Sequence, residues 1–258
     1  MQDYLIDTHA HIYLAEFDED RESIIGSATD AGVQEIYLPA IDSTTHEAML
    51  RTEAQYPCCK SMMGLHPCSI KEDFGREIRL IKEYLAQRKF IAIGEIGLDF
   101  YWDKTFSKQQ YEAFHQQIEL ALQYDRPIVI HSRNAIDECI EEVAKYPELR
   151  GVFHCFSGNE DQARRIMDLN FFLGIGGVVT FKNSGLDKVI ENIGLSSLVL
   201  ETDSPYLSPV PYRGKRNVPA YTKLVADKIA ALLNIPLQEV ASKTSQNAEK
   251  LFSLEQNH

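Results

Sequence analysis

The chain contains 258 residues, of which 44% are hydrophobic and 25% are charged, and its formal net charge is −12. These proportions are typical of an ordinary globular protein, while the acidic surplus argues against a protein whose whole surface binds nucleic acid. Any phosphate-bearing partner must therefore be held locally, by a bound metal or by a small basic patch.

No apolar segment approaches the roughly 18–20 residues that a membrane span needs. The opening stretch YLID, residues 4–7, predicts a strand rather than a signal peptide. The chain contains five cysteines, an odd number, without a C-x-x-C pair. This pattern favours free thiols in a reducing compartment. We therefore expect a cytoplasmic protein that does not enter the membrane.

Eight short apolar runs alternate with amphipathic stretches along the chain. The runs are YLIDTH, EIYLPAI, CKSMMGLHP, FIAIGEIGLDF, PIVIHS, GVFHCFSG, FFLGIGGVV and LVLETDSPYL. They are rich in Ile, Val, Leu and Phe without strict alternation, as expected for parallel strands buried on both faces. Helical patterns cover residues 18–31, 44–55, 75–88, 108–124, 135–146, 160–169, 184–192, 218–233 and 237–253.

Eight strand–helix units without a low-complexity linker predict an α/β fold, a (β/α)₈ TIM barrel forming one domain over residues 1–258. A doubly wound open sheet is the structural alternative, and the number of strands favours the barrel.

Two histidines at the end of the first run, His9 and His11, raise the question of a metal site. Residues two apart in a strand point to the same face, so both imidazoles can approach one point, and imidazole is a good ligand for divalent transition metals. The alternative is a pair of polar residues at a junction between strand and loop.

Other ligand-type side chains end further runs: His66, Glu95 with Asp99, His131, His154 and Asp203. Barrel active sites are assembled at the C-terminal ends of the strands. A single histidine there is more often a core residue, but six or more convergent ligands are hard to explain in that way. The pattern therefore predicts a metal site at this end of the barrel, to which His9 and His11 contribute.

The motifs DTHAH, GLHP, GEIGLDF, IHSR, HCFSG and ETDSPYL, in this order, resemble the TatD family of metal-dependent deoxyribonucleases, within the amidohydrolase-like barrels. The resemblance spans residues 3 to about 252 and includes RGKRNVP and QNAEKLF. Many amidohydrolases bridge two metals with a carboxylated lysine on the fourth strand. Here Glu95 occupies that strand end, and its carboxylate can bridge two ions unmodified.

The resemblance implies two divalent ions. His9, His11, Glu95 and Asp203 would hold one, and Glu95, His131 and His154 would hold the other. The metal could be Zn, Mn, Mg, Ni or Fe. Two ions suit in-line displacement at phosphorus by an activated water, which Asp203 could deprotonate. The implied reaction is 3′-to-5′ exonuclease cleavage of DNA, single-stranded or at 3′ ends, by a protein that we expect to be monomeric.

Further residues are candidates for substrate binding. His66 and Arg133 could contact phosphate oxygens or a leaving group, or could make structural hydrogen bonds. Arg213, Lys215 and Arg216, in RGKR, follow the eighth run and could bind phosphates beyond the metal centre, or form a solvated turn.

Three acidic residues near the expected site have less defined roles. Asp7 and Glu201 should lie a layer below the ligands, and Asp99 could orient a ligand or shape its loop. Tyr101, Trp102 and Tyr206 could stack on unpaired bases or pack against neighbouring loops.

Two other functions use the same residues. A hydrolase of C–N or lactone bonds needs nearly the same ligands, because a metal can polarise a carbonyl as it does a phosphate. A metal-bound scaffold that recognises a protein partner is the non-enzymatic alternative, and the intact ligand set argues against it.

Overall fold

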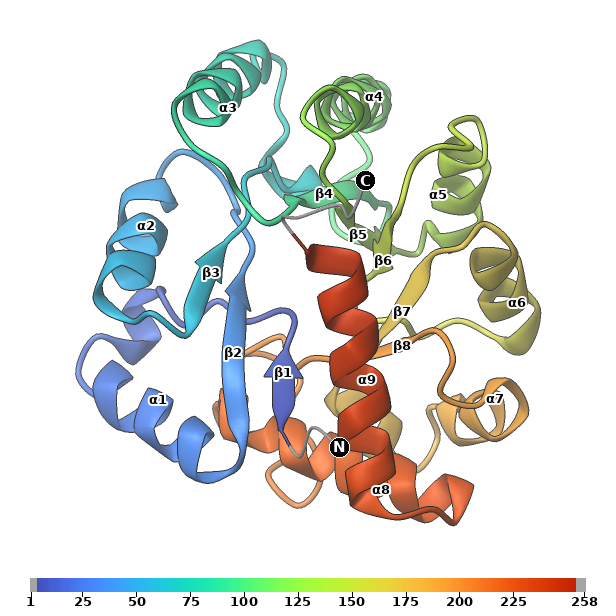
Figure 1. Cartoon of the computed structure of the whole chain (residues 1–258). Helices are drawn as coiled ribbons and strands as arrows, with labels where there is room; N and C mark the ends of the chain where they lie inside the picture. Colours follow the sequence, from blue (N-terminus) through green and yellow to red (C-terminus); the bar gives the residue numbers. More distant parts are fainter. Residues whose placement is uncertain (1–3, 254–258) are drawn as a thin grey trace.

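The computed structural model describes residues 4–253, in which eight parallel strands form a ring surrounded by helices (Figure 1). The strands are β1 (Leu5–Asp7), β2 (Val33–Leu38), β3 (Cys59–Ser61), β4 (Ile93–Asp99), β5 (Ile128–Arg133), β6 (Gly151–Phe153), β7 (Phe172–Ile175) and β8 (Leu198–Leu200). The helices are α1 (Arg21–Asp30), α2 (His46–Gln55), α3 (Gly75–Gln87), α4 (Ser107–Gln123), α5 (Ile136–Val143), α6 (Glu160–Asp168), α7 (Leu186–Ile193), α8 (Thr222–Leu233) and α9 (Leu237–Phe252).

Hydrogen bonds join the strands into two parallel sheets, β1-β2-β3 and β4-β5-β6-β7-β8. The sheets meet at two seams. At one seam Met63 pairs with Ile93, and at the other Ala10 pairs with Ser204, where the His11 N–H donates to the Ser204 carbonyl over 2.7 Å. The predicted (β/α)₈ barrel is therefore confirmed, and the eight strands fall on the eight apolar runs.

The barrel interior is closed at one end by α9. A hydrophobic cluster joins residues of β1, β2, β5, β6, β7 and β8 to Leu251 and Phe252 of this helix. Because strands from around the whole ring share one cluster, the cluster lies inside the ring, and the Phe252 ring packs edge-on against Tyr37 at 4.9 Å. Figure 1 shows α9 lying across the ring. The polar residues lie at the opposite end of the barrel, at the C-terminal ends of the strands.

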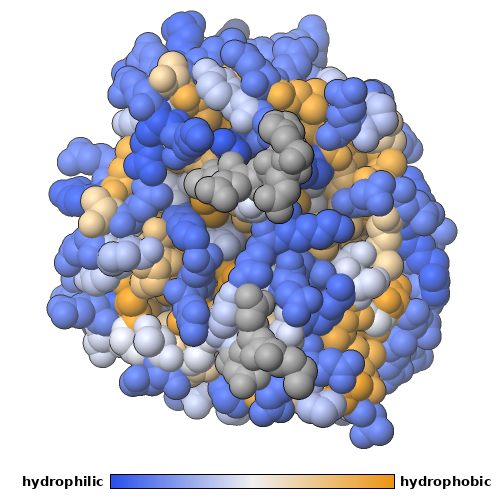
Figure 2. All heavy atoms as spheres, in the orientation of Figure 1, coloured by the Kyte–Doolittle hydropathy of each residue, from blue (hydrophilic) through white to orange (hydrophobic). Residues whose placement is uncertain are grey.

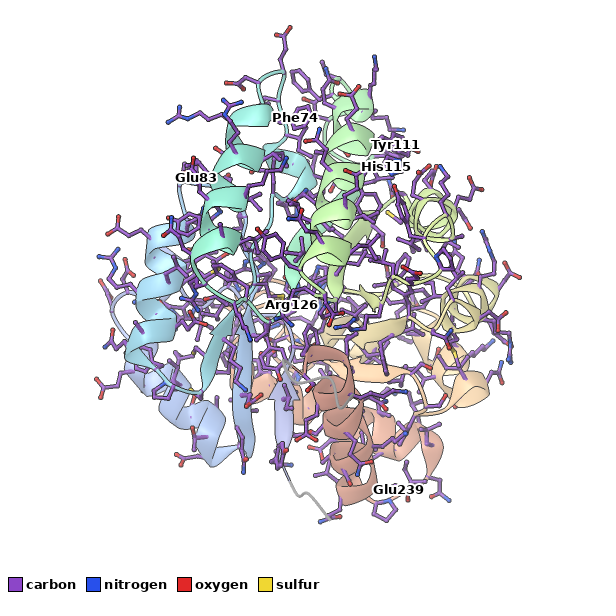
Figure 3. All side chains as sticks on the ribbon, turned by 45° about the horizontal axis from the view of Figure 1, so that its top comes forward. Phe74, Glu83, Tyr111, His115, Arg126 and Glu239 are labelled. Atoms are coloured by element: carbon purple, nitrogen blue, oxygen red, sulfur yellow. The ribbon has the colours of Figure 1, made fainter. Side chains whose placement is uncertain are left out.

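Neighbouring helices of the outer layer also contact each other. On α4, Tyr111 and His115 lie one turn apart (Figure 3). The His115 Nδ1 is 2.8 Å from the Tyr146 hydroxyl, and its Nε2 is 2.8 Å from Glu142 of α5.

Hydrophilic side chains cover most of the face that carries α9 (Figure 2). In residues 4–253, every helix is too short or too polar to cross a membrane.

Local structure differs from the sequence pattern near several predicted site residues. The strand β1 ends at Asp7, so His9 and His11 lie in the loop that follows it, and β6 ends at Phe153, directly before His154. The strand β3 ends at Ser61, five residues before His66, which instead begins the short 3₁₀ helix Pro67–Ser69 and accepts the Cys68 N–H at Nδ1. The strand β8 ends at Leu200, so Asp203 lies in the loop that follows. The Asp203 N–H donates to the His9 carbonyl over 2.9 Å, which holds this loop against the loop after β1.

Candidate metal centre

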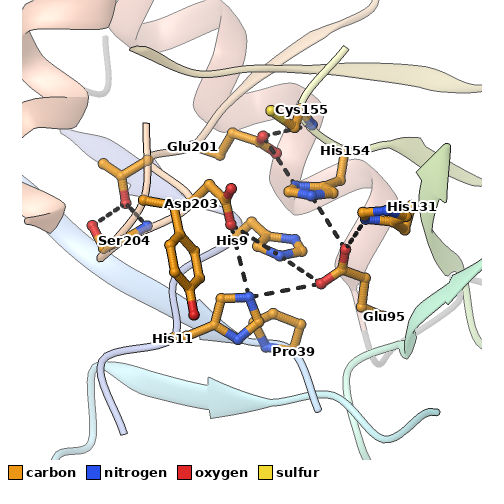
Figure 4. A network of polar contacts seen from close by, with 12 residues as sticks. His9, His11, Pro39, Glu95, His131, His154, Cys155, Glu201, Asp203 and Ser204 are labelled. Carbon is orange, nitrogen blue, oxygen red and sulfur yellow. Dashed lines mark hydrogen bonds and ion pairs between the residues drawn. The ribbon is translucent and has the colours of Figure 1, made fainter. Parts of the chain in front are cut away.

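The carboxylate of Glu95 lies at the centre of the polar cluster (Figure 4). Its Oε2 is 3.2 Å from His9 Nε2 and 3.7 Å from His11 Nε2. Its Oε1 is 2.8 Å from His131 Nδ1 and 3.3 Å from His154 Nε2. The two oxygens of one carboxylate therefore face two different pairs of histidines.

Asp203 approaches the same cluster from the loop after β8. Its Oδ1 lies 3.9 Å from His9 Nε2 and 3.8 Å from His11 Nε2. The structure thus brings His9, His11, Glu95 and Asp203 together on one side of the cluster. On the other side Glu95 meets His131 and His154, so all six predicted ligands lie in one place.

Several atoms of this cluster are buried without a hydrogen-bond partner. They are both ring nitrogens of His9, Nδ1 of His154 and Oε2 of Glu201. Buried polar atoms are normally satisfied, because an unpaired one costs free energy. Three groups of donor atoms also lie within 4.8 Å of one another: His9 with His11 and Glu95, His66 with Glu95 and His131, and His9 with His154 and Glu201. Closely spaced nitrogen and oxygen donors fit divalent cations such as Zn, Mn, Fe or Ni.

The electrostatics of the centre follow from its burial. Burial raises the pKa of Glu95, but His154, His66 and His9 outweigh it, so the net pKa lies well below its usual range. Burial lowers the pKa of His9 to about 4, with a further contribution from His154. Glu95 is therefore ionised and His9 neutral, which are the protonation states that bind metal. At His154 burial lowers the pKa, but Glu201 and Glu95 outweigh it, so the net pKa lies well above its usual range.

A hydrogen bond chain sets the tautomer of His11. The Tyr13 hydroxyl donates to the Pro39 carbonyl over 2.7 Å, so its oxygen can only accept from His11 Nδ1, 2.8 Å away. The proton is consequently on Nδ1, and the lone pair of Nε2 faces Glu95 and Asp203. Tyr13 is not among the site residues predicted from the sequence, although it continues the alternation of His9 and His11.

Asp99 fixes His131 in the same way. Its Oδ2 lies 2.8 Å from His131 Nε2, and this contact leaves Nδ1 on the side of Glu95. Partners of this kind orient metal-binding histidines and raise their basicity. The sequence left two roles open for Asp99. The contact with His131 fits the first of them, the orientation of a candidate ligand.

Glu201 and Asp7 lie behind the cluster, as their positions along the strands indicated. Glu201 Oε1 is 3.1 Å from His154 Nδ1, without hydrogen-bond geometry, and accepts the Cys155 N–H over 2.6 Å. Asp7 accepts the backbone N–H and the hydroxyl of Thr202, at 2.9 and 2.6 Å. Burial raises the pKa of Asp7 to about 8. Asp7 thereby ties the end of β1 to the segment after β8.

The predicted substrate-binding residues occupy different surroundings. His66 Nε2 lies 3.4 Å from Glu95 Oε1, and its ring is 4.5 Å from that of His131. Arg133 is exposed, and its guanidinium lies over the Tyr101 ring at 3.9 Å. His66 therefore belongs to the cluster itself, whereas Arg133 lies at its rim.

The residues of RGKR do not form one basic cluster. Arg216 pairs with Asp20 over 2.5 Å and donates to the Glu16 carbonyl, whereas Arg213 lies over the Phe181 ring at 3.6 Å. Lys215 lies between them in the chain and is exposed. Of the three basic residues, Arg216 is thus engaged with the segment that precedes α1.

A family model described as TatD related DNase matches residues 6–253, nearly the whole chain. The chain belongs to the TatD-related DNase family. The match contains every residue of the centre described above. The resemblance that the motifs indicated is therefore confirmed.

Curated proteins similar to this TatD-family chain include two bacterial relatives. The uncharacterized metal-dependent hydrolase YabD of Bacillus subtilis (strain 168) is 39% identical over 255 residues, which cover 97% of this chain and 99% of the relative. The uncharacterized metal-dependent hydrolase YcfH of Escherichia coli (strain K12) is 28% identical over 263 residues, which cover 98% of this chain and 97% of the relative.

Solved structures similar to this TatD-family chain include YjjV, a TatD homolog from Escherichia coli K12. It is 30% identical with a TM-score of 0.93, covering 99% of this chain and 100% of the other. A phosphotriesterase homology protein from Escherichia coli, 13% identical with a TM-score of 0.71 and covering 98% and 100%, shares the fold alone.

Proposed function

We propose that this TatD-family metal-dependent hydrolase cleaves phosphodiester bonds of DNA, removing nucleotides from the 3′ ends of single strands. The observation that carries the proposal is the position of Glu95, whose two oxygens face two separate pairs of histidines at 2.8–3.7 Å. A shared carboxylate between two donor groups suits a pair of ions, and paired ions are the usual catalysts of in-line displacement at phosphorus.

The residues present fit two divalent ions. His9, His11, Glu95 and Asp203 would hold one ion, and Glu95, His131 and His154 would hold the other. When bound, the ions would supply Lewis acidity to the phosphate oxygens and would lower the pKa of the attacking water. The mixed nitrogen and oxygen donors are compatible with Zn, Mn, Ni or Fe, and with Mg where water completes its coordination.

The chain itself supplies the proton acceptor. In this proposal the Asp203 carboxylate takes the proton of the attacking water, because it borders the first donor group and its side chain is still 14% exposed. The ligands His9, His11 and Glu95 are 0–4% exposed in their side chains, so they are closed to bulk water. Asp203 is thus the most exposed of the four residues that would hold the first ion, and it would meet the water and the substrate that arrive from solvent.

His66 and Arg133 would act on the substrate. His66 lies beside Glu95 and His131, with its side chain 15% exposed, where it could donate to a phosphate oxygen or to the leaving group. Arg133, on the rim, would contact the next phosphate along the strand. Arg213 and Lys215 would contact phosphates further from the centre, in the loop after β8. These local contacts let an acidic protein hold a polyanion.

An assay of the purified protein on three substrates tests the proposal. Single-stranded DNA, a bis-aryl phosphodiester and a panel of lactones are each incubated with and without chelator. Metal-dependent cleavage of DNA supports the proposal. Turnover of lactones alone would identify a hydrolase of carbonyl compounds instead, and metal binding without turnover of any substrate would indicate a scaffold.

A further inference from the structure

Large hydrophobic side chains are exposed at few positions in residues 4–253, and they are unevenly placed. Five of the six follow the C-terminal ends of β4 and β8, on the face that carries the metal centre; the sixth, Leu122, is near the end of α4. The five are Tyr101, Trp102, Tyr206, Leu207 and Val210. Exposed apolar groups gathered at one place often mark a binding surface.

Tyr101 and Trp102 form the most exposed aromatic pair of this set, at 51% and 67%. Their rings meet edge to face with centroids 4.8 Å apart. The Arg133 guanidinium lies over both, 3.9 Å from the Tyr101 centroid and 5.1 Å from the Trp102 centroid. We call these three residues the aromatic platform. An aromatic pair that served only to pack would be expected to bury more of its ring surface.

Asp99 ties the aromatic platform to the metal centre. Its Oδ2 contacts His131 Nε2, and its Oδ1 accepts the backbone N–H groups of Tyr101 and Trp102 at 2.9 and 3.1 Å. Arg133 follows His131 by two residues on β5. The platform is thus positioned by the same carboxylate that orients a candidate ligand of the metal.

A polar groove of about 1010 Å³ begins at the platform and runs over the loops after β5, β6 and β7. This volume is at the upper limit of pockets for single small molecules, about 300–1,000 Å³, so the groove suits a longer ligand. Its lining includes Tyr101, Arg133, Ser157, Asn159, Ser184 and Lys188.

The groove offers cationic side chains to an anionic strand despite the acidic chain. Of the three acidic side chains of the lining, Asp137 pairs with Arg165 over 2.5 Å and Glu160 pairs with Arg164 over 2.7 Å; the third is Glu138. Lys188, at the start of α7, is exposed in the lining. Arg133 and Lys188 are thus two cationic side chains that the groove can offer to a strand.

We propose that the aromatic platform stacks an unpaired nucleobase of a DNA strand, and that the polar groove holds the strand where it leaves the metal centre. This inference rests on the proposed nuclease function and adds a reason for a preference for single strands. A base inside a duplex has no free face to stack, whereas every unpaired base presents one, whatever its identity.

Binding is measured by fluorescence anisotropy with the metal-loaded protein. The probes are labelled oligothymidylates with phosphorothioate linkages that resist cleavage, each lacking one base at successive positions from the 3′ end. Loss of the stacked base should raise the Kd of the wild-type protein about 5- to 100-fold at one or two positions. In the double variant Tyr101→Ala/Trp102→Ala the same loss should change the Kd less than about twofold.

Two further variants serve as controls. Trp102→Phe keeps a stacking face and should retain most of the dependence on the base, while Leu122→Ala removes an exposed apolar group outside the catalytic face and should bind as the wild type does. Equal binding of all probes by the wild-type protein would overturn the platform, as would an undiminished base dependence in the double variant.

Hydrolysis of an unmodified strand is followed in parallel, so that the two proposals fail separately. A protein that discriminates the bases but cleaves no DNA would retain the platform and lose the nuclease function. A protein that cleaves DNA without any dependence on the bases would retain the nuclease function and lose the platform.

Discussion

The imidazole rings of His9 and His154 lie parallel, with centroids 3.6 Å apart and planes inclined by 14°. The two residues follow strands on opposite sheets, β1 and β6, so the contact joins the two halves of the barrel. Two positive charges at this distance repel strongly, and the pKa of His9 is lowered to about 4 by burial first and by His154 second. His9 is therefore neutral and able to donate a lone pair.

Removal of the shared carboxylate should empty both halves of the centre. We expect the Glu95→Ala protein to bind much less of either ion, because Glu95 Oε1 and Oε2 face different pairs of histidines. To check this, the protein is dialysed against a stoichiometric amount of metal, and its metal content is measured by mass spectrometry. Glu83→Ala, on the exposed surface of α3 (Figure 3), is the matched control. Loss of only one ion would show that Glu95 does not bridge.

The substitution Asp203→Asn should separate catalysis from metal binding. The amide preserves the size of the side chain and one oxygen, but it cannot take a proton from water. We expect kcat to fall by about 10²–10⁴, the usual scale for a general base, while most of the metal remains. Parallel measurements of kcat and metal content check this, and an unchanged kcat would remove Asp203 from the chemistry.

Asp99 should act on the metal centre through His131. In the Asp99→Asn protein the amide can no longer hold the His131 Nε2 proton as a carboxylate does. We expect the affinity for one of the two ions to fall about 10- to 100-fold, as is typical for such orienting partners. Competition with a chelating dye gives both affinities. Asp103→Asn, in the loop that follows Asp99 and exposed, should leave them unaltered.

The loop after β8 should contribute to the binding of long substrates through Arg213 and Lys215. When both are replaced by alanine, the slope of log affinity for single-stranded DNA against log salt concentration should become shallower by roughly 1.4, at about 0.7 for each phosphate contact. Titrations at several salt concentrations measure this slope. Replacement of Arg79 and Lys82 on α3 is the control, since both are exposed outside this loop. An unaltered slope would mean that the loop only faces water.

The sequence predicted the barrel and the gathering of the ligand-type side chains at one end of it, because both depend on local patterns. Each of His9, Glu95, His131 and His154 lies at the end of an apolar run, and parallel strands bring those ends together whatever the details of the loops. The eight runs and nine helical patterns were therefore enough to place the ligands at one end of the fold.

Contacts between distant segments were not predictable in the same way. Nothing in the RGKR motif indicates that Arg216 pairs with Asp20, which lies 196 residues earlier in the chain. The tautomer of His11 depends likewise on Tyr13 and on the carbonyl of Pro39, the residue after β2. The position of Glu201 behind His154 also requires the register between β6, β7 and β8, which only the assembled sheet defines.

In the proposed function, the centre around Glu95 hydrolyses DNA from a 3′ end. The most direct measurement follows single-stranded DNA labelled at its 5′ end, with products resolved by length over time. We expect a ladder of strands shortened one nucleotide at a time, which disappears when metal is chelated and returns when a divalent metal is restored. Intact DNA under all metal conditions, with turnover of a lactone instead, would contradict the account.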